Sequence, residues 1–102
     1  MPQSIESRLE APPRLVVDTR VDFRSAALEW LDRAEASGSG RLCIDMSSTE
    51  SVDASGLGTL VLVHKRARER GLKTRLVAPH PPIRTLLSIT KLEPLFEIAE
   101  IA

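Results

Sequence analysis

The sequence predicts an α/β fold, a small mixed sheet of about four to five strands with helices packed against it. An apolar run, Arg41–Met46, lies between a glycine-containing turn and Ser47-Ser48-Thr49, as a strand does. A segment of good helix formers follows and ends at Gly71, a typical residue just after a helix. Strand and helix patterns then alternate. Units of this length imply parallel neighbouring strands joined by right-handed crossovers.

The N-terminal part predicts two short strands and one amphipathic helix. Ile5–Leu9 and Leu15–Asp18 are the strand candidates, and Pro12-Pro13 between them suits a turn or a sheet edge. Asp22 stands at the N-cap position of a helix that ends before Gly38. The apolar residues of that helix recur at the spacing of one helical face: Phe23, Ala26, Ala27, Trp30, Leu31 and Ala34.

The C-terminal part predicts two helices and two strands. Pro82 fits the first turn of the second helix, in which Leu86 and Leu87 face inward. The expected elements are a helix over Ser55–Arg70, a strand over Lys73–Ala78, a short helix over Pro82–Ile89 and a short strand over Leu95–Ile98.

Length and charge limit the possible functions. The chain has 102 residues, with 14 Lys and Arg against 14 Asp and Glu, so we expect one domain over residues 1–102. Zero net charge gives no field that draws the protein to nucleic acid or to a membrane. No apolar run reaches the roughly 20 residues of a membrane span, and the N-terminus lacks a signal-peptide pattern. We therefore expect a cytoplasmic protein, with its single cysteine, Cys43, buried in a strand.

The segment Ser51–Gly58 is the candidate functional site. It places Ser55 at or near the start of a helix, where free backbone N–H groups favour a phosphate or another anion. Gly56 and Gly58 remove side-chain bulk, which we expect to let a partner approach the hydroxyl. From position alone, a helix cap explains Ser55 better than a regulatory role does. Asp53 is explained as a cap or turn former, or equally as a residue that helps a kinase to orient the hydroxyl.

Asp53-Ala54-Ser55-Gly56-Leu57-Gly58, preceded by the strand Leu42-Cys43-Ile44-Asp45, resembles the signature of STAS domains, typified by bacterial anti-sigma-factor antagonists. The order of strands and helices and the Pro81–Leu87 segment also fit, so the resemblance covers about residues 15–98. It implies that Ser55 is the phosphoacceptor of a serine kinase that is also the anti-sigma factor.

Two positions differ from the usual signature. Thr19-Arg20-Val21-Asp22 stands where the family usually has Gly-Glu-Leu-Asp, so an acidic residue is replaced by Arg20. Ala54 replaces a usual Ser or Thr, which leaves Ser55 as the one obvious acceptor. In this family the turn before Asp22 lies beside the acceptor loop, so Asp22 is either a cap or part of the site.

The resemblance implies a phosphorylation-switched binding module that binds the kinase when unphosphorylated and releases the sigma factor. The alternative is a STAS subunit that is never phosphorylated and binds a transporter or a stress-signalling assembly. We expect no cofactor, because any ATP is used by the partner. The partner-binding surface is expected at Asp22, Asp53, Ala54, Gly56, Leu57, Gly58 and Thr59.

Enzymatic readings have little support in the sequence. Ser55 is not in the Gly-x-Ser-x-Gly pattern of hydrolases, and the Gly56/Gly58 pair lacks the third glycine of a dinucleotide site. His64 and His80 have no second ligand at metal spacing and are expected to be solvated or at helix ends. The basic run over residues 64–70 is explained by its place at the end of a helix, where cations are favourable. A nucleic-acid site is less well supported, because no aromatic residues that could stack on bases are interleaved.

Overall fold

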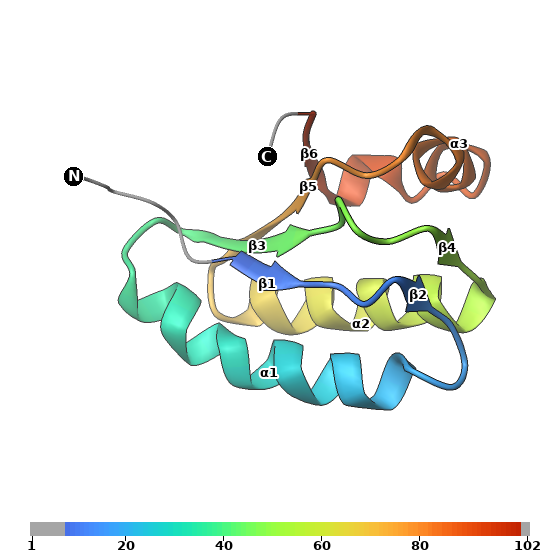
Figure 1. Ribbon diagram of the computed structural model, residues 1–102. Coiled ribbons are helices and arrows are strands. Elements are labelled where there is room, and N and C mark those ends of the chain that lie inside the picture. Colours follow the sequence, from blue (N-terminus) through green and yellow to red (C-terminus); the bar gives the residue numbers. More distant parts are fainter. Residues whose placement is uncertain (1–7, 101–102) are drawn as a thin grey trace.

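The computed structural model describes residues 8–100 and has a four-stranded parallel sheet at its centre (Figure 1). Its strands lie in the order β1 (Arg8–Glu10), β3 (Arg41–Asp45), β5 (Lys73–Val77) and β6 (Glu97–Ala99). β3 and β5 are the central strands, and they hold most of the buried apolar side chains of the sheet. Apolar residues are needed where a strand is covered by other elements.

Two helices, α1 (Arg20–Ala36) and α2 (Ala54–Glu69), cover one face of this sheet (Figure 1). Leu42 and Ile44 of β3 and Leu76 of β5 belong to the core and are fully buried, and alternate residues of a strand face the same side. The side chains that form the core with them include Leu9, Leu15, Phe23, Leu31, Met46, Leu57, Leu60, Val63, Leu72, Ile83, Leu87 and Phe96.

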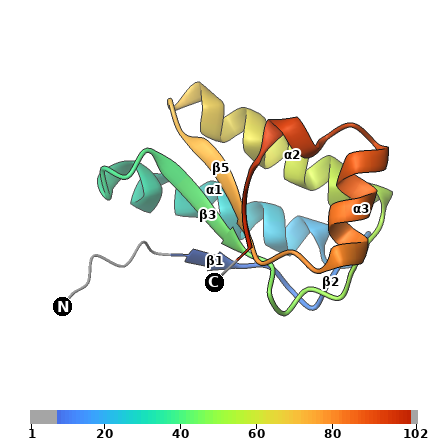
Figure 2. The ribbon, with the colours of Figure 1, turned by 90° about the horizontal axis from the view of Figure 1, so that it is seen from above.

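A second, very small sheet lies at one end of the molecule. It pairs β2 (Arg14–Leu15) in parallel with β4 (Ser51–Val52). The helix α3 (Pro81–Ile89) lies at this same end, and the turn η1 (Glu93–Leu95) then leads the chain into β6 (Figures 1 and 2). The start of α2 is therefore surrounded by β2, β4 and the turn that precedes α1.

The predicted α/β class and the helices packed against the sheet are confirmed, and Cys43 is buried in β3 as expected. The strands described all pair in parallel, whereas a mixed sheet was expected. The Pro12-Pro13 break is confirmed, because it separates β1, at the edge of the larger sheet, from β2 in the smaller one. Residues 5–7 of the first predicted strand lie outside the described residues.

Three boundaries were wrong by more than one residue. The predicted strand Leu95–Ile98 begins later, as β6, because Leu95 closes the turn η1. The predicted strand Leu15–Asp18 ends at Leu15, because the Thr19 hydroxyl accepts from Val16 N at 3.0 Å and donates to Arg14 O at 2.6 Å, closing a turn. Thr19 is consequently the N-cap residue of α1, and Asp22 lies inside the first turn instead of capping it. None of the helices within residues 8–100 combines the length and apolar character that a membrane crossing requires.

Candidate functional site

Asp53 fixes the start of α2. Its backbone is extended, and its carboxylate accepts from Gly56 N at 2.8 Å and from Val17 N at 3.1 Å. The hydrogen bond from Gly56, supported by those from Val17 and Ser55, holds the pKa of this carboxyl below its ordinary value. Asp53 is therefore the helix cap and also ties the turn before α1 to the start of α2.

Ser55 is the second residue of α2 and is half-buried. Its hydroxyl has no hydrogen-bond partner among residues 8–100, whereas its carbonyl oxygen accepts from Thr59 Oγ1 at 3.0 Å. The sequence prediction of a hydroxyl at the start of this helix is confirmed, although the cap itself is Asp53. The Ser55 side chain is thus available at the end of the helix that favours anions.

Three residues expected on the partner-binding surface are buried. Leu57 belongs to the core, and Thr59 is 6% exposed with its hydroxyl bonded to Ser55 O. Gly56 packs so closely on β2 that a Cβ there would lie 2.1 Å from Leu15 O. Gly56 therefore makes room for the protein's own backbone, whereas a Cβ at Gly58 would meet open space. A partner that approaches Ser55 meets Ala54 and Gly58, which are exposed.

An apolar contribution to this surface was missed by the sequence analysis. Val17 is 54% exposed and Val21 is 47% exposed, and Val17 N is bonded to Asp53 at the start of α2. The sequence predicts a strand at Val17. The residue lies instead in a short turn, where no repeating pattern of apolar and polar residues indicates which side chains are exposed. The structure thus places exposed valines in the segment that adjoins Ser55.

Asp22 is exposed and lines a surface hollow of about 490 Å³ together with Pro12, Pro13 and Ser48. No residue of the 53–59 segment lines this hollow. No hydrogen bond or ion pair within residues 8–100 joins Asp22 to the Ser55 motif, and its role in partner binding stays a prediction.

The two histidines differ. His80 is the N-cap residue of α3, as expected for a helix-end histidine, with Nε2 2.7 Å from Ser47 O. His64 was expected to be solvated or at a helix end, but it lies within α2 with its ring edge-on to Phe96 at 5.6 Å. Burial, reinforced by Arg68 and Lys65, lowers the pKa of His64. Within residues 8–100, no cluster of three or more His, Cys, Asp or Glu side chains is arranged to hold a metal ion.

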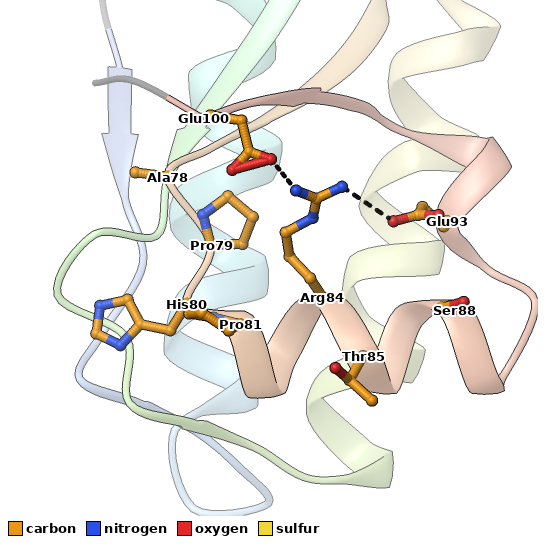
Figure 3. A pocket seen from close by; sticks show the side chains of 9 residues that line it. All are labelled: Ala78, Pro79, His80, Pro81, Arg84, Thr85, Ser88, Glu93 and Glu100. Atoms are coloured by element: carbon orange, nitrogen blue, oxygen red, sulfur yellow. Dashed lines mark hydrogen bonds and ion pairs between the residues drawn. The ribbon is translucent and has the colours of Figure 1, made fainter.

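Several charged side chains elsewhere form ion pairs within the fold. In the basic run, Arg66 pairs with Glu69, and Arg70 pairs with Asp32 at 2.6 Å and with Glu35. Figure 3 shows Arg84 of α3 reaching Glu93 and Glu100, while His80 points away from them. Arg84 therefore joins α3 to the two ends of the η1–β6 segment, and with Glu93 and Glu100 it lines a hollow of about 530 Å³.

Comparison with known proteins agrees with this geometry. Residues 14–101 match the model of the STAS domain family. The chain belongs to the STAS domain family. That assignment covers the start of α2 with its Ser55 motif, the helices and every strand except β1.

Solved structures of STAS proteins have the same fold. A STAS-domain protein from Planctomyces limnophilus, described as an anti-sigma-factor antagonist, has 19% identity and a TM-score of 0.76, over 93% of this chain and 82% of that one. A Thermotoga maritima protein assigned as an anti-sigma factor antagonist has 22% identity and a TM-score of 0.70, over 95% and 82%. SpoIIAA of Bacillus in its phosphorylated form has 17% identity and a TM-score of 0.60, over 90% and 78%.

Proposed function

We propose that this STAS domain is an anti-sigma-factor antagonist controlled by phosphorylation of Ser55. The supporting observation is the accessible Ser55 hydroxyl at the start of α2, which no residue from 8 to 100 hydrogen-bonds. Thr59, the next hydroxyl of the helix, is buried and already donates to Ser55 O. The similar fold of SpoIIAA, a protein solved in phosphorylated and unphosphorylated forms, supports the same assignment.

In the unmodified state, the surface around Ser55 docks on a serine kinase that is also the anti-sigma factor. Ala54 and Gly58 add little bulk, and Val17 and Val21 provide apolar area that a partner can bury. Docking there occupies the anti-sigma factor and leaves its sigma factor free. The kinase brings the ATP, and the antagonist acts by binding without a cofactor of its own, in the cytoplasm.

Phosphorylation reverses this docking through local charge. A phosphate carries a charge of about −1.5 to −2 at neutral pH. At Ser55 it would stand beside the Asp53 carboxylate, which already accepts from the Gly56 and Val17 N–H groups. These backbone N–H groups are therefore not free to bind the phosphate. It has to be desolvated when a partner docks, so the complex dissociates.

A phosphorylation assay tests the acceptor. Incubation with the cognate kinase and ATP should add one phosphate, which fragment-ion mass spectrometry should locate on Ser55. Ser55→Ala should receive none, and Ser88→Ala, which removes an exposed hydroxyl from α3, should be modified at the normal rate. A phosphate on Ser47, Ser48 or Thr59 would contradict the proposal. No phosphate on any residue, with binding intact, would favour constitutive binding instead.

A further inference from the structure

A second hollow, separate from the Ser55 motif, lies between the C-terminal half of α2 and strands β5 and β6. It has a volume of about 540 Å³, within the range of small-molecule sites. We call it the His64 hollow. Its lining residues are His64, Arg68, Gly71, Leu72, Lys73, Thr74, Pro94, Leu95, Phe96 and Glu97. His64 lies nine positions after Ser55 in α2, which is roughly 14 Å along the helix axis.

Two polar atoms of the lining residues lack partners. His64 Nδ1 and Thr74 Oγ1 are buried and make no hydrogen bond, and Thr74 as a whole is only 1% exposed. A buried polar atom without a partner destabilises the folded state, so such atoms are rare and call for an explanation. Both atoms belong to residues of the same hollow. A hydroxyl group can donate to one of them and accept from the other.

The rest of the His64 hollow is apolar inside and cationic at its rim. Leu72 and Phe96 are buried, and Leu95 is 36% exposed. Arg68 is exposed and forms no ion pair within residues 8–100, while Lys73 lies 3.8 Å from Glu97. Glu97 is also engaged by Arg41 at 2.8 Å and by Arg75 at 3.4 Å. An anionic group at the rim is therefore attracted by Arg68.

We propose that the His64 hollow binds a small organic acid that carries a hydroxyl group at the other end of an apolar body. The carboxylate lies at the rim with Arg68, and the apolar body packs against Phe96 and Leu95. The hydroxyl pairs with Thr74 Oγ1 and His64 Nδ1, the two buried polar atoms without partners. This site is independent of phosphorylation at Ser55.

The experiment is an NMR titration of the full chain with 3-(4-hydroxyphenyl)propanoate, compared with 3-phenylpropanoate, which lacks the hydroxyl. We expect saturable shifts in the amides of residues 64–74 and 94–97. We also expect the hydroxylated acid to bind about three- to tenfold more tightly, as one net hydrogen bond allows. Arg68→Gln should weaken both acids at least about threefold. Arg66→Gln, which removes a charge from the same helix outside the hollow, should not.

Thr74→Val separates binding from folding. Valine has nearly the shape of threonine without the hydroxyl, so it should raise the thermal stability of the free protein and abolish the preference for the hydroxylated acid. Two results would overturn the proposal. One is the absence of saturable shifts up to about 10 mM of either acid, where millimolar binding is detected. The other is unchanged binding of both acids in Thr74→Val and Arg68→Gln.

Discussion

The two glycines of the Ser55 motif should respond oppositely to the same substitution. At Gly58 an added methyl meets open space in the interior of α2, so Gly58→Ala should stabilise the protein by up to about 1 kcal/mol through helix propensity. At Gly56 the same methyl would stand 2.1 Å from Leu15 O and 3.0 Å from Val52 Cγ1. The nearest atom is a backbone oxygen of β2, and backbone cannot relieve the contact by rotating about a bond as a side chain can.

Overpacking of this kind costs about 1–3 kcal/mol. At Gly56 the strain also pushes α2 away from β2 and threatens the hydrogen bond from Asp53 N to Leu15 O at 3.3 Å. We therefore expect Gly56→Ala to lose at least about 2 kcal/mol. In a domain of this size 1 kcal/mol corresponds to about 4–8 °C, so Tm should fall by about 8 °C or more, against a rise of up to about 8 °C for Gly58→Ala.

Urea unfolding followed by circular dichroism, together with thermal melts, measures both variants against the wild type. The reasoning is refuted if Gly56→Ala is as stable as the wild type, or if both substitutions change stability in the same direction. Either result would mean that the close approach of α2 to β2 does not exist in solution.

Two further predictions concern pH. Because the pKa of Asp53 is lowered by folding, its charge stabilises the protein above about pH 4, the ordinary carboxyl range, and this contribution disappears as pH falls through the folded-state pKa. The stability difference between wild type and Asp53→Asn, measured by urea unfolding, should therefore shrink in acid, and a constant difference would contradict it. The pKa of His64 is also lowered, by burial, so the unfolded state takes up a proton near pH 6.5 before the folded state does. The wild type should lose stability as pH falls below about 6.5, and His64→Gln should lose less over the same range; equal losses in urea titrations would rule this out.

The larger elements were predictable because their signals are local. The sequence predicts α2 from a run of helix formers that ends at Gly71, whose φ of +74° suits glycine. β3 is predicted by the apolar run Leu42–Ile44, which lies between turns. The pairing of β2 with β4 was not predictable. Each strand has two residues, and the register of Arg14 with Ser51 depends on contacts between distant parts of the chain.

The candidate site was predicted in composition but not in exposure. The sequence places Ser55 at the start of α2. At the start of α1, however, Thr19 and Asp22 are both residue types that can cap a helix. Only the turn closed by the Thr19 hydroxyl decides between them. The same limit applies to Gly56 and Gly58, since identical residues two positions apart lie on opposite sides of the helix surface. Which of them faces the protein depends on where β2 packs.

Binding calorimetry with the anti-sigma-factor kinase, without ATP, tests the central claim that charge at Ser55 controls docking. We predict that Ser55→Ala binds within about threefold of the unmodified protein. Ser55→Asp should bind about tenfold more weakly or worse, a loss of about 1.4 kcal/mol. Ser88→Asp, which adds the same charge to the exposed surface of α3, should bind like the wild type. Equal affinities for Ser55→Asp and Ser55→Ala would contradict the account, because the surface around Ser55 would then not be the one that the kinase recognises.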